Sequence, residues 1–185
     1  MEENKKKKIS TKDMVQIAMF TAVVAVLSQI AIPMPSGVPV TLQTLAVALC
    51  GYVLGSKKGA VSLLVYALLG AVGAPVFANF KGGLGAIAGP TGGFIWGFIF
   101  MAFLCGLGIE SKHKWQAVVL GIAGVLVCHA CGAAQFAMIK GNGFWSSALL
   151  VSVPYLVKDF VSVIIALGAA ALIRSRIKVT AAANQ

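Results

Sequence analysis

Charged residues are few in this sequence, and acidic residues are fewer than basic ones. Of its 185 residues, 11% are charged and only five are Asp or Glu, whereas 59% are hydrophobic. A soluble domain of this length needs a charged surface, which this composition cannot provide. A soluble protein is therefore excluded, and we predict a single membrane domain over residues 1–185.

Motifs for ATP hydrolysis, catalysis and metal binding are also missing. No stretch matches the phosphate-binding pattern GxxxxGK[ST], so the chain cannot hydrolyse ATP by that route. There is no nucleophile elbow, and an intramembrane enzyme is not expected. The stretch CHAC (128–131) offers three ligands within one helical turn and no second cluster, so we expect it to pack rather than bind metal. We predict no metal site and no cofactor.

Strand-like alternation is absent, whereas long apolar runs recur. Helices satisfy their own backbone hydrogen bonds in lipid, so helices rather than a barrel are expected. Six runs are long enough, or nearly so, to cross a hydrocarbon core of about 30 Å. They cover residues 13–33, 41–55, 58–74, 90–108, 115–137 and 150–173. We therefore predict an all-α integral membrane protein with six transmembrane helices.

The positions of the basic residues predict how these helices are oriented. Twelve of the 15 Lys and Arg residues fall on one side of a six-span arrangement, which also holds the basic segment 1–12 and the tail 174–185. Cytoplasmic loops carry an excess of such residues, so both termini are predicted to be cytoplasmic. The cations form no basic face with interleaved aromatics. The lipid bilayer is therefore an expected partner, and nucleic acid is not.

One acidic residue, Asp159, lies well inside its predicted span. At 1.5 Å per residue it is about 13 Å from the outer surface. A carboxylate facing lipid would cost several kcal/mol, so Asp159 should face the bundle and have a partner. Its neighbour Lys158 is expected to point elsewhere and extend outward, because adjacent helical residues point about 100° apart. The carboxylate therefore predicts a buried binding site, with a structural anchor as the alternative.

Further polar residues fall in the same outer half of the predicted bundle. Three outer connections are rich in Gly and Pro, and the longest of them, residues 74–89, is the best candidate for a pocket-lining loop. The polar residues expected to converge there are Thr41, Gln43, Thr44, Asn79, Lys81 and Thr91. Mostly apolar pockets with a few polar groups are typical of small-molecule sites. We predict a pocket open to the exterior for a small, partly apolar ligand with amide-like or carboxylic groups.

Three stretches of the chain resemble one known family. They are VPVTLQTLAV (38–47), GAVGAPVFANFKGGLGAIAGPTGGF (70–94) and PYLVKDF (154–160). They resemble the BioY family, the biotin-binding S components of energy-coupling factor (ECF) transporters. The resemblance implies the six-helix S-component fold in a prokaryotic plasma membrane. It also implies capture of biotin for ATP-driven uptake, with a transmembrane coupling protein and two ATPase subunits as partners.

The resemblance also implies which residues bind the ligand. Asp159 is expected to bind the ureido N–H groups of biotin, and Asn79 to hydrogen-bond the same ureido group. The pocket wall is expected to include Phe80, Gly82, Gly83, Gly89 and Thr91. The family often has Lys three residues after the aspartate, where this chain has Ser162, a candidate hydrogen-bonding member of the site. The valerate carboxylate then needs Lys81, Lys140 or backbone N–H groups.

Two alternative functions stay open at this point. The shared fold does not fix the ligand, so the first is an S component for another vitamin. The second is an ion-coupled secondary transporter that uses Asp159 as a relay, although no inverted repeat supports it. Separately, Ala18, Ala22 and Ala25 place small side chains on one face of the first predicted span. That face fits either docking on the coupling protein, as the resemblance implies, or packing within the bundle.

Overall fold

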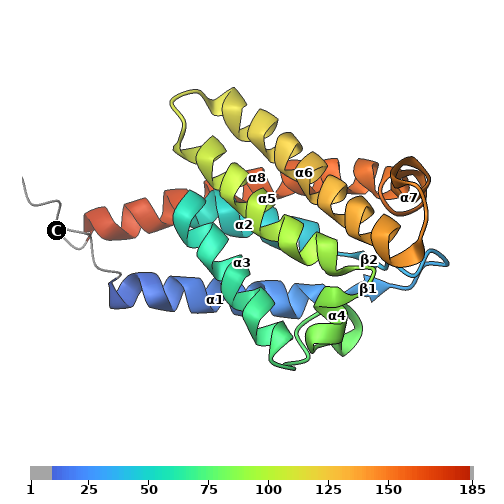
Figure 1. Cartoon of the computed structure of the whole chain (residues 1–185). Coiled ribbons are helices and arrows are strands. Elements are labelled where there is room, and N and C mark those ends of the chain that lie inside the picture. The colour runs from blue at the N-terminus through green and yellow to red at the C-terminus, as the bar shows by residue number, and fades with distance from the viewer. Residues whose placement is uncertain (1–9, 184–185) are drawn as a thin grey trace, which may run out of the picture.

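A computed structural model describes residues 10–183 as a helical bundle, with side chains described through Arg176 (Figure 1). Most of the basic segment 1–12 and the end of the tail 174–185 lie outside the described residues. The two short strands pair antiparallel, with Ala31 opposite Thr41. The elements are α1 (Thr11–Ser28), β1 (Ala31–Ile32), β2 (Val40–Thr41), α2 (Gln43–Leu54), α3 (Ser56–Ala71), η1 (Ala78–Phe80), α4 (Leu84–Ala88), α5 (Gly92–Glu110), α6 (Lys114–Lys140), α7 (Phe144–Val151) and α8 (Val153–Ala183).

The longer helices correspond to the predicted apolar runs. Within the described residues, α1, α5, α6 and α8 are long and apolar enough to cross a membrane by length and composition. The two others are shorter, with 12 residues in α2 and 16 in α3. The helical class is confirmed, and the count of six membrane crossings stays a prediction.

The helix ends differ from the predicted runs in two places. The first run extends to residue 33, but α1 ends at Ser28 and the chain turns into β1. Pro33 and Pro35 follow there, and proline has no N–H for a helical hydrogen bond. The last run starts at residue 150, but a break at Ser152 separates α7 from α8. Helix α8 then continues to Ala183, through most of the segment predicted as a tail.

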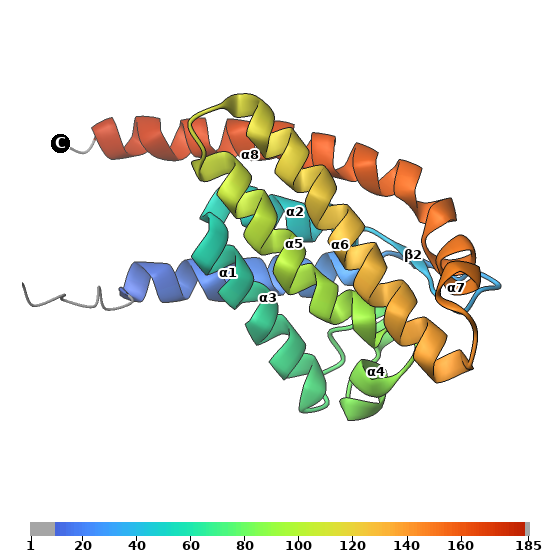
Figure 2. The same ribbon diagram turned by 45° about the horizontal axis from the view of Figure 1, so that its top comes forward.

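The two ends of the bundle contain different structural elements. The start of α1 and the end of α8 lie at the same end, near the α2–α3 and α5–α6 turns (Figures 1 and 2). We call it the terminal end (residues 10–13, 54–58, 110–114 and 174–176). The opposite end, here the cavity end (residues 29–42, 72–91 and 141–152), contains β1, β2, η1, α4 and α7.

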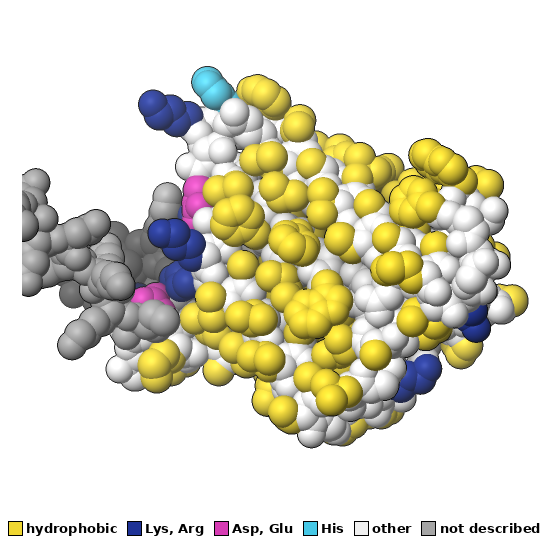
Figure 3. Space-filling model, in the orientation of Figure 1, with side chains coloured by type: hydrophobic (Ala, Val, Ile, Leu, Met, Phe, Trp, Pro, Cys, Tyr) yellow, Lys and Arg dark blue, Asp and Glu magenta, His cyan; other side chains and the backbone are white. Residues whose placement is uncertain are grey.

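The flank of the bundle is apolar, and most of its visible charged side chains gather at the terminal end (Figure 3). Large exposed apolar side chains include Leu68, Phe100, Leu126 and Ile165, from four different helices. An exposed apolar surface of this extent is typical of a protein that contacts lipid. On α1, Ala18 and Ala22 are exposed and Ala25 is half-buried. Ala25 packs against the core, whereas packing within the described bundle does not account for Ala18 and Ala22.

Helix α2 lies at the centre and packs against α1, α3, α5 and α8. Nine of its 12 residues are buried, so the shortest predicted span forms the middle of the core. Helices α5 and α6 approach each other closely because glycine lies at their contact. A Cβ at Gly97 would lie 2.7 Å from the Cα of Cys128, and one at Gly93 would lie 2.2 Å from the carbonyl oxygen of Cys131. This contact positions the middle of α6 beside the site described next.

Candidate ligand-binding site

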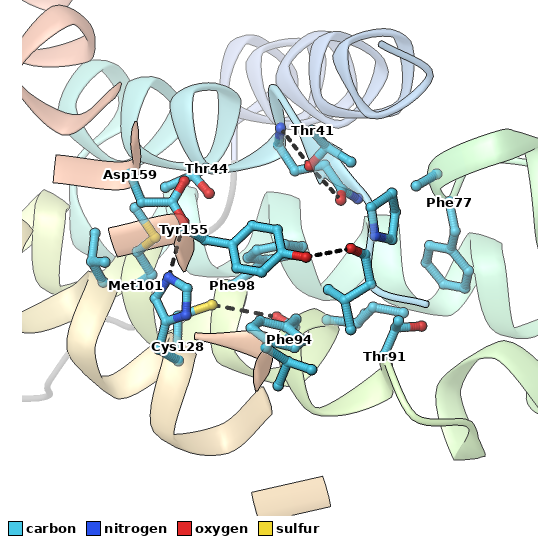
Figure 4. A pocket seen from close by; sticks show the side chains of 18 of the residues that line it. Thr41, Thr44, Phe77, Thr91, Phe94, Phe98, Met101, Cys128, Tyr155 and Asp159 are labelled. Carbon is cyan, nitrogen blue, oxygen red and sulfur yellow. Dashed lines mark hydrogen bonds and ion pairs between the residues drawn. The ribbon is translucent and has the colours of Figure 1, made fainter. Parts of the chain in front are cut away.

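A cavity lies within the cavity end of the bundle, among α2, α5, α6 and α8 (Figure 4). Its empty space is about 830 Å³ when the part that is open to solvent is included. Its walls are largely apolar, with Phe77, Phe94, Phe98 and Met101 among the largest side chains. The polar residues that line it are Thr41, Gln43, Thr44, Asn79, Lys81, Thr91, His129, Tyr155, Lys158 and Asp159. The predicted convergence of the first six of these is confirmed.

The carboxylate of Asp159 lies on the wall of this cavity. Asp159 is six residues beyond the start of α8, about 9 Å along the helix, and only 4% of the residue is exposed. Its Oδ2 lies 2.9 Å from Nε2 of His129 on α6. Its Oδ1 forms an ion pair with Lys158, and the hydroxyl of Thr44 lies beside the carboxylate (Figure 4). The prediction that Asp159 faces the bundle and has a partner is confirmed.

Lys158 points into the site, so the prediction that it extends away is wrong. Its Nζ pairs with the carboxylate of Asp159 and donates a hydrogen bond of 2.9 Å to the carbonyl of Thr41. Adjacent Cβ atoms on a helix do diverge, but the flexible four-carbon stem of lysine crosses that gap. Lys158 thus supplies the cation beside Asp159 and ties α8 to β2, just before the start of α2.

His129 is the member of this site that the sequence did not reveal. Only 7% of the residue is exposed, and its ring packs edge-on against Phe94 with 5.7 Å between ring centroids. Its Nδ1 has no hydrogen-bond partner among the described residues. A lone histidine in an apolar run was an available signal, since such a residue is costly in a membrane. Its pairing with Asp159 depends on how α6 packs against α8, which the sequence does not state.

The neighbours of His129 in the CHAC stretch do not assemble a metal site. The thiol of Cys128 donates to the carbonyl of Phe94 at 3.7 Å. The described residues contain no group of three His, Cys, Asp or Glu side chains placed to hold a metal ion.

The long connection between α3 and α5 lines the cavity, as predicted for residues 74–89. The ring of Phe77 occupies the place of a missing side chain, because a Cβ at Gly70 would lie 1.9 Å from it. Asn79 has a φ of 59°, a left-handed backbone that Asn adopts more readily than most residues. Asn79, Lys81 and, at the start of α5, Thr91 all line the cavity.

Five predicted site residues do not line the cavity. They are Phe80, Gly82, Gly83, Gly89 and Ser162. Phe80 is 71% exposed. Gly82 allows the loop to pack on itself, since a Cβ there would lie 2.4 Å from the carbonyl oxygen of Ala74. Ser162 donates a 2.9 Å hydrogen bond to the carbonyl of Lys158, one turn earlier on α8. Their contact with a ligand stays a prediction.

The connection between α1 and α2 also closes over the cavity, because Val38 and Pro39 line it. The hydroxyl of Tyr155 donates a 2.7 Å hydrogen bond to the carbonyl of Val38 (Figure 4) and lies 2.9 Å from Oγ of Ser36. A side chain on α8 therefore holds this connection in place.

The fold and the cavity together define an α-helical membrane protein with a small-molecule site buried at one end. The model of the BioY family matches residues 3–179, so this chain belongs to the BioY family. The family and the relatives described next are transporter components rather than enzymes.

Individual relatives are similar over most of the chain. A "Biotin transporter BioY" from Thermotoga maritima is 44% identical over 122 residues, which cover 65% of this chain and 72% of the relative. Another protein of that name, from Rhodobacter capsulatus, is 36% identical over 164 residues, which cover 80% and 86%. Among solved structures, the S-component for biotin from an ECF-type ABC transporter superposes with a TM-score of 0.78. It is 25% identical and covers 95% of each chain.

Proposed function

We propose that this chain is the membrane subunit that captures biotin from the exterior for ATP-driven uptake. The observation that carries the proposal is the buried Asp159 carboxylate on the wall of a largely apolar cavity. Membership of the BioY family and the names of its relatives support biotin as the ligand.

The functional groups of biotin match the cavity. Its ureido ring carries two N–H donors, and a carboxylate accepts such donors in strong, charge-assisted hydrogen bonds. We assign the ureido group to Asp159, with Asn79 as a second hydrogen-bonding partner. The thiophane ring and valeryl chain then lie against the apolar walls. Contact of the ligand with Phe80, Gly82, Gly83, Gly89 and Ser162 is part of the same proposal and rests on the resemblance to the family.

The valerate carboxylate is assigned to Lys81. Among the two lysines expected to serve it, Lys81 lines the cavity and Lys140 does not. Lys81 is exposed, so it offers a solvated positive charge at the mouth. Biotin thus enters with its ureido ring first and its carboxylate nearest the solvent.

The proposed topology has six membrane crossings with both termini in the cytoplasm and the cavity facing the exterior. The positive-inside distribution of the cations supports it, and so does the position of the terminal end opposite the cavity (Figure 1). Green fluorescent protein fused to the C-terminus should fluoresce, and alkaline phosphatase fused there should be inactive. The opposite result would reverse the orientation.

ATP-driven uptake needs other subunits to hydrolyse the ATP, because the chain has no phosphate-binding loop. We propose that a transmembrane coupling protein and two ATPase subunits supply it. Vesicles containing this chain with those partners should accumulate biotin only with ATP. Uptake driven by a pH gradient through the chain alone would favour the ion-coupled alternative instead.

Binding by the purified chain tests the ligand assignment directly. Titration calorimetry in detergent should give saturable binding of biotin and none of thiamine or riboflavin. Preference for either of those vitamins would replace biotin as the ligand while keeping the cavity as the site.

A further inference from the structure

One ring nitrogen of His129, Nδ1, is buried without a hydrogen-bond partner among the described residues. His129 lines the cavity and is 7% exposed. Buried polar atoms without a partner are rare in folded proteins because each one costs free energy. An unpaired atom of this kind in the wall of a binding cavity indicates a partner that arrives with the ligand.

The charges around the ring determine what Nδ1 offers. The negative charge of Asp159 is already balanced by the ion pair with Lys158. We take His129 as the neutral imidazole, because Asp159 already has a cationic partner in Lys158. Its Nε2 lies 2.9 Å from the carboxylate and must donate to it, because a carboxylate only accepts. The one proton is therefore on Nε2, and Nδ1 is left as an acceptor.

We propose that Nδ1 of His129 accepts a hydrogen bond from an N–H group of the bound ligand. This inference rests on the proposed function, in which the ligand is biotin. Oδ1 of Asp159 is the second acceptor that lacks a hydrogen bond of its own, apart from the ion pair with Lys158. One ureido N–H binds Asp159 and the other binds His129. The site therefore selects cyclic ureas, which carry two N–H donors, over carbamates and lactams, which carry one.

A glutamine at position 129 separates this contact from a purely positioning role. His129→Gln places an amide N–H near the position of Nε2, so it can still hold Asp159, but it has no acceptor at the position of Nδ1. We expect about tenfold weaker biotin binding with an unchanged melting temperature, a size typical of one buried hydrogen bond. Wild-type affinity in this variant would overturn the proposal, because a positioning role alone would be preserved.

Analogues of biotin test the same contact from the ligand side. Two cyclic carbamates can be made, each with one ureido N–H replaced by a ring oxygen. One of them should bind the wild-type chain about tenfold more weakly for loss of its contact with His129, and His129→Gln should largely abolish that difference. Equal losses in both proteins would overturn the proposal. A wild-type chain that binds no biotin at pH 7.5 would instead refute the proposed function itself.

Discussion

The two ends of the bundle use charged side chains in opposite ways. At the terminal end, the carboxylate of Glu110 accepts hydrogen bonds from the N–H (2.9 Å) and hydroxyl (2.7 Å) of Ser56, at the start of α3. Arg174 donates to the carbonyls of Tyr52 and Val53, at the end of α2. Both charges complete a helix end that would otherwise leave backbone groups unpaired.

Beside the cavity, two charges lie along the side of a helix. Asp159 and Lys158 are within α8, where the backbone is already hydrogen-bonded and needs no cap. Their burial costs desolvation that their mutual attraction only partly offsets. The comparison teaches that position along a helix distinguishes a charge kept for stability from one kept for a ligand. Four substitutions, three of them with a counterpart at the other end, can break or sharpen that distinction.

The largest effect is expected for Asp159→Asn. Loss of the charged acceptor, and of the counter-ion for Lys158, should weaken biotin binding about 100-fold, or roughly 2.7 kcal/mol, as measured by calorimetry. The matched control is Asp13→Asn, which removes a partly exposed partner of Lys58 at 3.1 Å. Such surface pairs contribute little, so its affinity should not change. Similar affinities in the two variants would remove the distinction between the ends.

The next effect is expected for Lys158→Met. The variant leaves the buried carboxylate without its cation and the Thr41 carbonyl without its donor. Biotin affinity should fall about tenfold, and the melting temperature in detergent should fall as well. Lys58→Met is the counterpart at the terminal end and should change neither quantity appreciably. A binding loss confined to Lys58→Met would contradict our assignment.

A smaller effect is expected for Tyr155→Phe. The variant loses the hydroxyl that holds the α1–α2 connection over the cavity through Val38. Biotin should dissociate about three to five times faster in a chase experiment, since one neutral hydrogen bond contributes about 1 kcal/mol. Tyr52→Phe is the counterpart, because that hydroxyl donates to the carbonyl of Ala117 at 2.7 Å. Tyr52→Phe should lower the melting temperature without changing the rate of biotin dissociation. An unchanged dissociation rate in Tyr155→Phe would show that the α1–α2 connection does not retain the ligand.

The smallest effect on binding is expected for Glu110→Gln. The amide loses the charge that strengthens two hydrogen bonds at the start of α3, so unfolding should become easier by about 1 kcal/mol. Biotin affinity should equal that of the wild type, because the residue is at the far end from the cavity. A tenfold loss of affinity here would mean that the two ends are coupled and cannot be compared as separate regions.

The sequence predicted the parts of the fold and site that follow from the cost of polarity in lipid. That cost correctly predicted that Asp159 faces inward, and helix order correctly predicted that polar residues from distant segments line one cavity. The path of the Lys158 side chain could not be predicted, because it depends on an acceptor that the turn into α2 presents. The pairing of His129 with Asp159 likewise depends on the packing of α6 against α8. Phe80 was expected in the wall, but an irregular loop gave no periodicity from which to judge its direction.

The absence of a side chain at Gly70 influences the width of the cavity. The Phe77 ring, which lines the cavity, packs in the space that this glycine leaves on α3. A methyl group added at Gly70 would displace the Phe77 ring and so change the shape of the cavity. Gly70 and Phe77 therefore influence the volume of the cavity, whereas Asp159 and His129 supply its hydrogen-bond acceptors. Substitutions can change one of these properties separately from the other.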